Sequence, residues 1–394
     1  MLSRKKFIAQ SGMLAAGIAM RPSLAFANNF ETKRPPLAYR KFTSEAVEAT
    51  IVGMKKKITD PELAWLFENC FPNTLDTTVE FEMIESKPDT YVITGDIDAM
   101  WLRDSTAQVW PYLPFIKNDA KLRELIEGVI NRQKKCIILD PYANAFYKDV
   151  NKISEWKSDL TKMQPGIHER KWEIDSLCYP IRLAYRYWKT SGDIKVFDAD
   201  WKQCIKLTLQ TFKEQQRKHG DGPYSFQRTT AWATDGVPLA GYGYPVKPVG
   251  LICSTFRPSD DATLFSFLVP SNFFAVVSLK QSAEILNAVY KDAAMANECL
   301  SLAKEVEKAL QQYAIIHHQQ YGKIYAFEVN GFGSFNLMDD ANVPSLLSLP
   351  YLNAVKSNDP IYVNTRKYLL SANNPDKALI LQALKSWVVE ISIE

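Results

Sequence analysis

The chain has 394 residues, and 46% of them are hydrophobic, which is enough for a sizeable core in one large domain or two ordinary ones. The formal charge is only +3, from 47 basic and 44 acidic residues, and no basic stripe is visible, so there is no electrostatic reason to expect nucleic-acid binding. Aromatic residues are plentiful, with 9 Trp, 18 Tyr and 20 Phe. A surplus of Trp and Tyr suits a carbohydrate cleft, where ring faces pack on the C–H faces of sugars.

The N-terminus has the pattern of an export signal. "MLSRKKF" is a positive start, "IAQSGMLAAGIAM" is a short apolar stretch, and Ala25–Ala27 is a small-residue cleavage site. "SRKKF" resembles a twin-arginine signal, with Lys5 in place of the second arginine. We therefore expect a signal peptide at residues 1–27 and an exported protein, in the bacterial periplasm or at the cell surface. The alternative is a membrane anchor, which the shortness of the apolar run disfavours. We expect no stable membrane span in the mature chain.

Helical signals recur along most of the remaining chain. Asp60 and Pro61 form an N-cap and N1 pair, which predicts that a helix starts at Pro61. Apolar residues at helical spacing predict further helices, over 122–130, 173–188, 205–212, 271–290 and 302–313. Strand signals are few, although "KIYAFEVNGFGSF" contains an Asn330-Gly331 turn that predicts a small hairpin. This pattern predicts one α-helical toroid with its functional residues on loops at one end.

The six cysteines have no spacing that predicts a metal site. They are scattered without a CxxC pair: Cys70, Cys136, Cys178, Cys204, Cys253 and Cys299. Since zinc sites need closely spaced ligands, we expect no zinc. Most lie on apolar faces, so buried free thiols are the favoured interpretation. Disulfides are the alternative in an oxidising compartment, and spacing alone does not pair them.

The stretch "TGDIDAMWLRDSTAQVWPYLPF", residues 94–115, combines carboxylates, a guanidinium and indoles. Its candidate site residues are Asp96, Asp98, Trp101, Arg103 and Asp104. Arg103 and Asp104 are adjacent, and adjacent side chains on a helix do not face each other. We therefore expect them to reach separate partners, and to contact ligand rather than core. The alternative is a capped helix start with a solvated face.

The stretch "STFRPSDDATLFSFLVPSN", residues 254–272, contains two neighbouring carboxylates. In a confined site, Asp260 and Asp261 would push each other's pKa apart, which suits a general acid. The alternative is structural, because Ser259 can cap a helix that has both aspartates in its first turn, where the helix dipole favours acids.

A third stretch, "NLMDDANVPSLLSLPYL", gathers Asp339, Asp340, Asn342 and Ser345 at what reads as the entry from a loop into a helix. Helix capping and ligand binding are both open for these four residues.

Several other chemistries lack their sequence motifs. No serine–histidine nucleophile motif, phosphate loop or GxGxxG fingerprint is present, and His168, His317 and His318 lack metal-ligand spacing. The remaining chemistry is carboxylate acid/base work with aromatic and polar substrate binding. That combination is typical of glycoside hydrolases, in which one acid protonates the leaving oxygen and a second carboxylate acts as base or nucleophile.

These stretches resemble family 125 of the glycoside hydrolases, the exo-α-1,6-mannosidases. The likeness is carried, in order, by residues 94–115, "DPYANAF", "EIDSLCYPIRLAYRYW", "FRPSDDATLFSFLVPSN" and "DDANVPSLLSLPYL". It implies an (α/α)6 barrel, removal of terminal α-1,6-linked mannose with inversion, a mannose-containing glycan as partner, and no required cofactor or metal.

The resemblance also assigns roles to individual residues. It implies that the general acid is Asp260 or Asp261 without deciding between them. It implies a mannose pocket lined by Trp101, Arg103 and Asp104, with Arg257, Ser271 and Asn272 nearby. The further substrate-binding candidates are Asp96, Asp98, Asp340 and Asn342.

The C-terminal residues depart from the family pattern. After "NTRKYLL" the resemblance leads us to expect a Gly-rich "GIGGPH"-like segment, more barrel helices and a "HESF"-like segment that carries the catalytic base. The sequence instead reads "SANNPDKALILQALKSWVVEISIE". We therefore expect one hydrolase domain over residues 28–394 that is divergent or truncated after about residue 371, with an incomplete toroid and no base.

Three other functions remain open. One is another inverting α-glycosidase on a similar toroid, for example one specific for glucose. The second is a non-catalytic, sugar-binding remnant of the family. The third is a helical scaffold without a sugar site. Titration with mannose and glucose separates them, because the scaffold binds neither sugar and the remnant binds without turnover.

The departure at the C-terminus generates a prediction. Loss of a positioned general base typically costs about 10²–10⁴-fold in rate. We expect the 394-residue chain to hydrolyse α-1,6-mannobiose at least that much more slowly than a version extended by the family-type C-terminal segment. Mannose release by both purified proteins measures the difference. Equal rates would mean that another carboxylate, for example one in "MDDAN", is the base.

Overall fold

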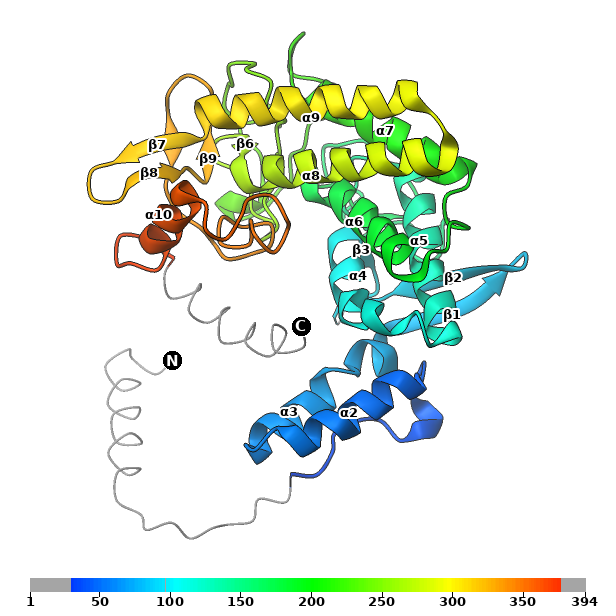
Figure 1. Ribbon diagram of the computed structural model, residues 1–394. Helices are drawn as coiled ribbons and strands as arrows, with labels where there is room; N and C mark the ends of the chain where they lie inside the picture. The colour runs from blue at the N-terminus through cyan, green and yellow to red at the C-terminus, as the bar shows by residue number, and fades with distance from the viewer. Residues whose placement is uncertain (1–29, 96, 377–394) are drawn as a thin grey trace, which may run out of the picture.

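The computed structural model describes residues 30–95 and 97–376. Helices make up most of its regular structure, as Figure 1 shows, and the predicted helices are confirmed. The α-helices are α2 (Glu45–Lys57), α3 (Pro61–Cys70), α4 (Leu102–Val109), α5 (Ala120–Leu139), α6 (Ile174–Ser191), α7 (Ala199–Gln215), α8 (Val269–Ile285), α9 (Ala293–Tyr313) and α10 (Pro360–Leu369). Short helical turns accompany them, among them η3 (Trp110–Phe115) after α4 and η5 (Leu286–Tyr290) after α8.

Local sequence signals set the helix ends. The carboxylate of Asp60 accepts hydrogen bonds from the N–H groups of Glu62 and Leu63, so Asp60 caps α3 as predicted. α6 ends at Gly192, which adopts a left-handed conformation with φ of 73° and caps the helix. These polar caps satisfy backbone groups that the helices themselves leave unpaired.

The helices pack in pairs around a single large core. α8 lies along α9, α6 packs on α8 and α4, and α5 packs on α6 and α7. The predicted apolar face of α5 is buried, including Leu122, Leu125 and Ile126. Five of the six cysteines are buried and Cys70 is exposed, and all six are free thiols, as the favoured interpretation predicted.

Short strands are more numerous than the sequence suggested. Within the described residues they form four small sheets: β1 (Val79–Ile84) with β2 (Lys87–Val92); β3 (Met100–Trp101), β4 (Ala145–Phe146) and β5 (Ile167–Glu169); β6 (Phe267–Leu268), β9 (Glu328–Val329) and β10 (Phe335–Asn336); and β7 (Ile315–His318) with β8 (Gly322–Tyr325). All pairs are antiparallel, and the predicted hairpin is confirmed at β9 and β10, on either side of Asn330. Most of these strands have two to four residues, too few to show an alternating pattern.

Two predictions depend on residues outside the described part. The expected signal peptide at residues 1–27 and the segment that follows residue 376 both lie outside it. Among the described residues, no helix has both the length and the apolar character that a membrane crossing needs.

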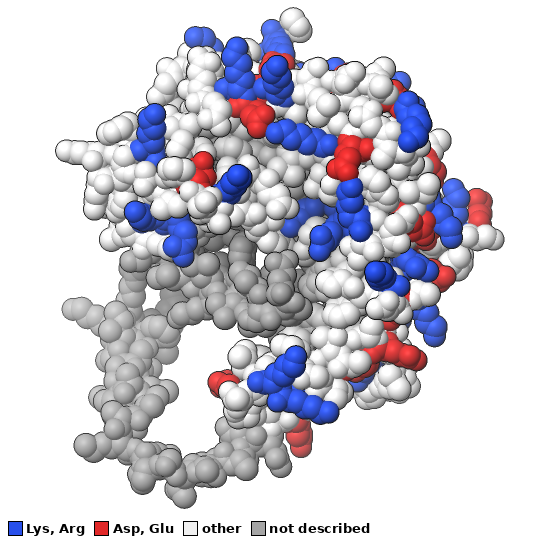
Figure 2. Space-filling view, in the orientation of Figure 1, with Lys and Arg blue, Asp and Glu red and all other residues white. Residues whose placement is uncertain are grey.

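Figure 2 shows basic and acidic side chains interspersed over the visible face, in keeping with the small net charge.

Two glycines make a matched pair for a stability test. A Cβ on Gly128 in α5 would meet Thr90 Oγ1 at 2.3 Å and Thr90 N at 2.8 Å, whereas a Cβ on Gly53 in α2 would meet nothing within 4 Å. We expect Gly128→Ala to lower the free energy of unfolding by about 1–3 kcal/mol through overpacking. Gly53→Ala should raise it by about 0.5–1 kcal/mol, because alanine favours the helix. Urea denaturation measures both; equal effects would contradict the close packing of α5 on β2.

Candidate active site

A buried arginine at the start of α4 is the centre of the site. Arg103 Nη1 lies 2.7 Å from Glu173 Oε2 and 3.1 Å from Asp175 Oδ2, and Arg103 Nη2 lies 3.8 Å from Asp260 Oδ1. Arg103 Nε is also 3.6 Å from Asp104 Oδ2. As predicted, the Arg103 guanidinium makes its hydrogen bonds to residues other than Asp104. The expectation that Arg103 and Asp104 form no ion pair is wrong. The Arg103 side chain is only 10% exposed and is surrounded by carboxyl groups, and its predicted contact with a ligand stays a prediction.

Short strands and one helix start bring these charges together. β3 leads directly into α4, so Trp101 and Arg103 stand at the end of a paired strand. β4 pairs with both β3 and β5, which places the chain after β5 beside them. Glu173 is the N-cap residue of α6 and Asp175 lies in its first turn, where the helix dipole favours negative charge.

The two carboxylates on α6 are buried with unused hydrogen-bonding capacity. Glu173 and Asp175 are both fully buried, and burial raises the pKa of each above its ordinary value. Glu173 Oε2 also accepts a hydrogen bond from Ser176 Oγ at 2.9 Å. Glu173 Oε1 and Asp175 Oδ1 have no hydrogen-bond partner among the described residues. Buried acceptors without partners are rare, and a bound hydroxyl group is one way to satisfy them.

Asp260 stands at the tip of a tight loop rather than in a helix. Phe256 and Ala262 form an antiparallel bridge, and Asp260 between them has a left-handed φ of 65°. The N–H of Asp260 donates to the carbonyl of Arg257 at 2.9 Å, and Lys171 Nζ donates to the carbonyl of Asp260 at 3.1 Å. The alternative in which Ser259 caps a helix is therefore wrong, because the chain here closes a hairpin-like turn.

The carboxyl group of Asp260 combines a buried oxygen with access to solvent. Its side chain is 44% exposed, yet Oδ1 is buried and lies 3.8 Å from Arg103 Nη2. No donor of another type reaches this oxygen among the described residues, and the carboxyl group of Glu173 is its hydrogen-bonding neighbour when one of the two acids holds a proton. Burial raises the pKa of Asp260, and the carboxylate of Glu169 adds to the shift. A raised pKa keeps a carboxylic acid protonated closer to neutral pH, which a proton donor requires.

A second layer holds this loop in place. Glu328, in the middle strand of its sheet and fully buried, accepts from Arg257 Nε at 2.7 Å and from the N–H groups of Leu264 and Phe265 at 3.2 Å. On the other side, Ser259 Oγ donates to Asp340 Oδ2 at 3.2 Å. Arg257 and Asp340, both predicted to bind substrate, therefore support the loop that carries Asp260.

Trp101 provides an aromatic surface with an unused donor. Its side chain is buried beside His168, with ring centroids 5.1 Å apart in an edge-to-face arrangement. Trp101 Nε1 is buried without a hydrogen-bond partner in the described part of the chain. His168 Nδ1 is 2.8 Å from Tyr147 Oη, and burial lowers the pKa of the histidine, which favours its neutral form.

Other predicted residues lie outside the charge cluster. Asp98 forms an exposed ion pair with Lys152. The side-chain amide of Asn272 makes its hydrogen bonds to the backbone of Ile252 and Leu268, so the contacts of Asn272 are structural. Ser271 is fully buried, and its hydroxyl has no hydrogen-bond partner among the described residues. Asp261 accepts a hydrogen bond from Ser259 Oγ at 3.1 Å, and the exposed Asn342 donates one to the carbonyl of Asp340. Asp96 lies outside the described residues.

Sequence reasoning missed four charged residues of the site. Glu173 and Asp175 belong to a segment that we had noted for its helical spacing and its resemblance, and two acids at the start of a predicted helix were a usable signal. Lys171 and Glu328 gave no comparable signal, because a single charge in a short strand or connector resembles a surface residue. Among the described residues, no cluster of three or more His, Cys, Asp or Glu side chains is placed to hold a metal ion.

Asp339 generates a prediction about pH. It is fully buried at a turn, where it accepts from the N–H groups of Ala341 and Leu347; no helix starts there, so the predicted loop-to-helix entry is wrong. Burial raises the pKa of Asp339 to about 7. The pKa of an unfolded Asp is about 3.9. Between about pH 3.9 and the folded pKa, Asp339 therefore holds a proton in the folded chain that it has lost in the unfolded chain. Stability therefore falls as pH rises through this window.

We expect Asp339→Asn to flatten that fall, because an amide does not titrate. The slope of the free energy of unfolding should differ from that of the parent chain by up to about 1.4 kcal/mol per pH unit between pH 4 and 7. Urea denaturation at several pH values measures it. Parallel slopes for the two proteins would show that Asp339 does not hold the proton.

Comparison with known proteins gives a consistent result. The chain matches the family model of the metal-independent alpha-mannosidases (GH125) over residues 60–376. It is 42% identical over 361 residues to the meiotically up-regulated gene 157 protein of Schizosaccharomyces pombe, covering 87% of this chain and 71% of that protein. A solved Streptococcus pneumoniae structure is described as a metal-independent alpha mannosidase in a non-productive complex with alpha-1,6-mannobiose. It matches with a TM-score of 0.81 and 41% identity, covering 85% of this chain and 78% of that one.

The described helices and small sheets agree with the predicted six-hairpin (α/α)6 fold of these enzymes. With a family match across most of its length and a relative above 40% identity, the chain belongs to glycoside hydrolase family 125, the metal-independent α-mannosidases.

Proposed function

We propose that this chain is an exo-acting, inverting α-1,6-mannosidase that removes terminal mannose from glycans. The observation that carries the proposal is a set of buried, unpartnered polar atoms, three of them on carboxyl groups in ion-pair contact with Arg103 and one on Trp101, two residues before it in the chain. They are Trp101 Nε1, Glu173 Oε1, Asp175 Oδ1 and Asp260 Oδ1. One donor and several acceptors, close to a partly exposed acid, match what a single sugar residue with several hydroxyl groups requires. The mannobiose bound by the Streptococcus relative supports the α-1,6 linkage.

We propose Asp260, rather than Asp261, as the general acid. Asp260 faces Arg103 and has a buried oxygen and a raised pKa. Asp261 instead takes part in the loop, accepting from Ser259 Oγ with its carboxylate and from Arg257 N with its carbonyl at 2.8 Å. An acid needs a side chain that reaches the glycosidic oxygen, and this arrangement leaves Asp260 as the one that points into the charge cluster.

The charge cluster also suggests how the sugar is held. Arg103 balances one of the two negative charges that Glu173 and Asp175 would carry, and burial raises the pKa of both carboxyl groups, which favours a retained proton on the pair. Their free oxygens can then accept hydrogen bonds from sugar hydroxyls. Trp101 would contribute its indole Nε1, which is buried without a partner among the described residues, as a donor to the sugar. Inversion requires a base on the opposite face, with the two carboxyl groups roughly 6.5–9.5 Å apart to admit a water molecule. We place that base on the "HESF"-like segment expected from the family pattern.

The assignment of the acid is tested by leaving groups. In the extended chain, Asp260→Asn should reduce turnover of α-1,6-mannobiose by about 10²–10⁴-fold. It should reduce turnover of a dinitrophenyl α-mannoside far less, because a good leaving group needs little protonation. Asp261→Asn is the matched control and should affect both substrates alike. A larger selective loss in Asp261→Asn would move the acid to that residue.

The same assays separate the alternatives. Release of mannose but not glucose from matched aryl glycosides supports a mannosidase, whereas the reverse would indicate a glucose-specific enzyme. Binding of mannobiose without turnover in both the original and the extended chain would indicate the non-catalytic remnant.

A further inference from the structure

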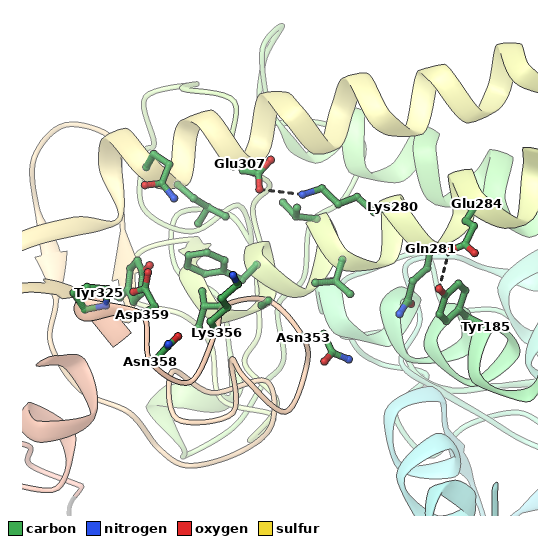
Figure 3. Close-up of a pocket in the computed structure, with 18 residues that line it drawn as sticks. Tyr185, Lys280, Gln281, Glu284, Glu307, Tyr325, Asn353, Lys356, Asn358 and Asp359 are labelled. Carbon is green, nitrogen blue, oxygen red and sulfur yellow. Dashed lines mark hydrogen bonds and ion pairs between the residues drawn. The ribbon is translucent and has the colours of Figure 1, made fainter. Parts of the chain in front are cut away.

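A cavity of about 600 Å³ lies along α8, from Phe273 to Glu284, and reaches Tyr185 near the end of α6. Figure 3 shows it between α8, α9 and the segment that leads into α10. α6 contributes Asp175 to the cluster at its start and Tyr185 to the cavity near its end. Ten residues of helix separate the two, or about 15 Å. The cavity is therefore a separate place on the molecule, and its volume is within the range of small-ligand sites.

The cavity has an apolar floor and a polar rim. Phe273, Leu310 and Tyr325 line it and are buried, and the Phe273 and Tyr325 rings meet edge to face with centroids 5.1 Å apart. The rim carries the side-chain amides of Gln281 and Asn353, among others. Apolar surface with a few convergent amide groups is typical of sites for uncharged polar ligands.

The charged side chains of the rim are largely neutralised within the protein. Lys280 Nζ lies 3.0 Å from Glu307 Oε1, as the dashed line in Figure 3 shows. Glu284 accepts from Tyr185 Oη at 2.7 Å and pairs with Lys189. Lys356 and Asp359 also line the cavity, so its charged side chains are two lysines and three acids. Such a mixture of signs gives no strong preference for a phosphate group or a polycation.

Gln281 leaves an acceptor for the ligand. Its Oε1 atom is buried and has no hydrogen-bond partner among the described residues. In Figure 3 the Gln281 side chain lies beside Tyr185 at one edge of the cavity. A buried carbonyl oxygen without a donor is costly, and a ligand hydroxyl would satisfy it once the Gln281 amide turns toward the cavity.

We propose that this cavity is a second carbohydrate-binding site, which holds a neutral oligosaccharide arm at a distance from the acid cluster. Sugar hydroxyls would meet Gln281 and the other rim amides, and C–H faces would pack on the floor. The choice of a mannoside as ligand rests on the proposed function. A branched glycan could then be held by one arm in the cavity while another of its arms is cleaved at the acid cluster. Two separate glycan molecules could also occupy the two places at once.

The experiment counts bound ligand. The probe is a sulfur-linked analogue of α-1,6-mannobiose, which the enzyme does not hydrolyse, and equilibrium dialysis of the radiolabelled analogue against the 394-residue chain gives moles bound per mole. We expect two. Gln281→Met keeps the side-chain volume and removes the acceptor, and should weaken one of the two events about 3- to 10-fold. Gln210→Met, at an exposed glutamine of α7, is the matched control and should change neither.

Variants at the two places make the outcomes distinct. Asp104→Ala should remove the event at the acid cluster and leave the Gln281-dependent event in place. A single event that Asp104→Ala abolishes would overturn the second site and leave the proposed function standing. An event that depends on Gln281 and not on Asp104, with no second event, would support the cavity and count against the proposed mannoside pocket. If two molecules bind and neither affinity changes in Gln281→Met or in Tyr185→Ala, the proposal is also overturned. Thermal unfolding checks that each variant is folded.

Discussion

The burial of one guanidinium among carboxylates is the constraint on which the rest of the site depends. Arg103 compensates Glu173 and Asp175, which are fully buried, and lies within ion-pair distance of Asp260. A buried carboxylate without a partner is strongly unfavourable, and breaking a buried pair typically costs about 3–5 kcal/mol. The start of α4, the start of α6 and the Asp260 loop are therefore held in one arrangement by electrostatics, with helix packing as their support.

That arrangement leaves some carboxylate oxygens of the site free to accept hydrogen bonds from a ligand. The guanidinium satisfies one oxygen of each α6 carboxylate and leaves the other unpartnered among the described residues. A sugar that donates hydroxyls to those oxygens recovers hydrogen bonds that the folded protein has forgone, and it does so where water has been largely excluded. Stability and binding therefore draw on the same atoms, so substitutions here change both.

The sequence predicted the helices well and the geometry of the site only in part. Caps such as Asp60 and stops such as Gly192 are local, and the apolar face of α5 follows one period, so each could be recognised within a few residues. The two- and three-residue strands could not, because they are defined by pairing between distant segments. Asp260 was found as a candidate, but its left-handed backbone and its separation in role from Asp261 come from loop closure. Lys171 and Glu328 act on that loop from elsewhere in the chain, which no local pattern records.

The wide spacing of the site along the chain has a consequence for folding. Arg103 and Asp175 are 72 residues apart, and the contact of Tyr179 Oη with the carbonyl of Val343 spans 164 residues. Contacts of such long range close large loops and slow the search for the native state, whereas single helical hairpins form early. The charge cluster therefore exists only once distant parts of the chain have docked. A ligand of this cluster binds the native state alone, so its binding during refolding reports completion of the whole domain rather than of any one hairpin.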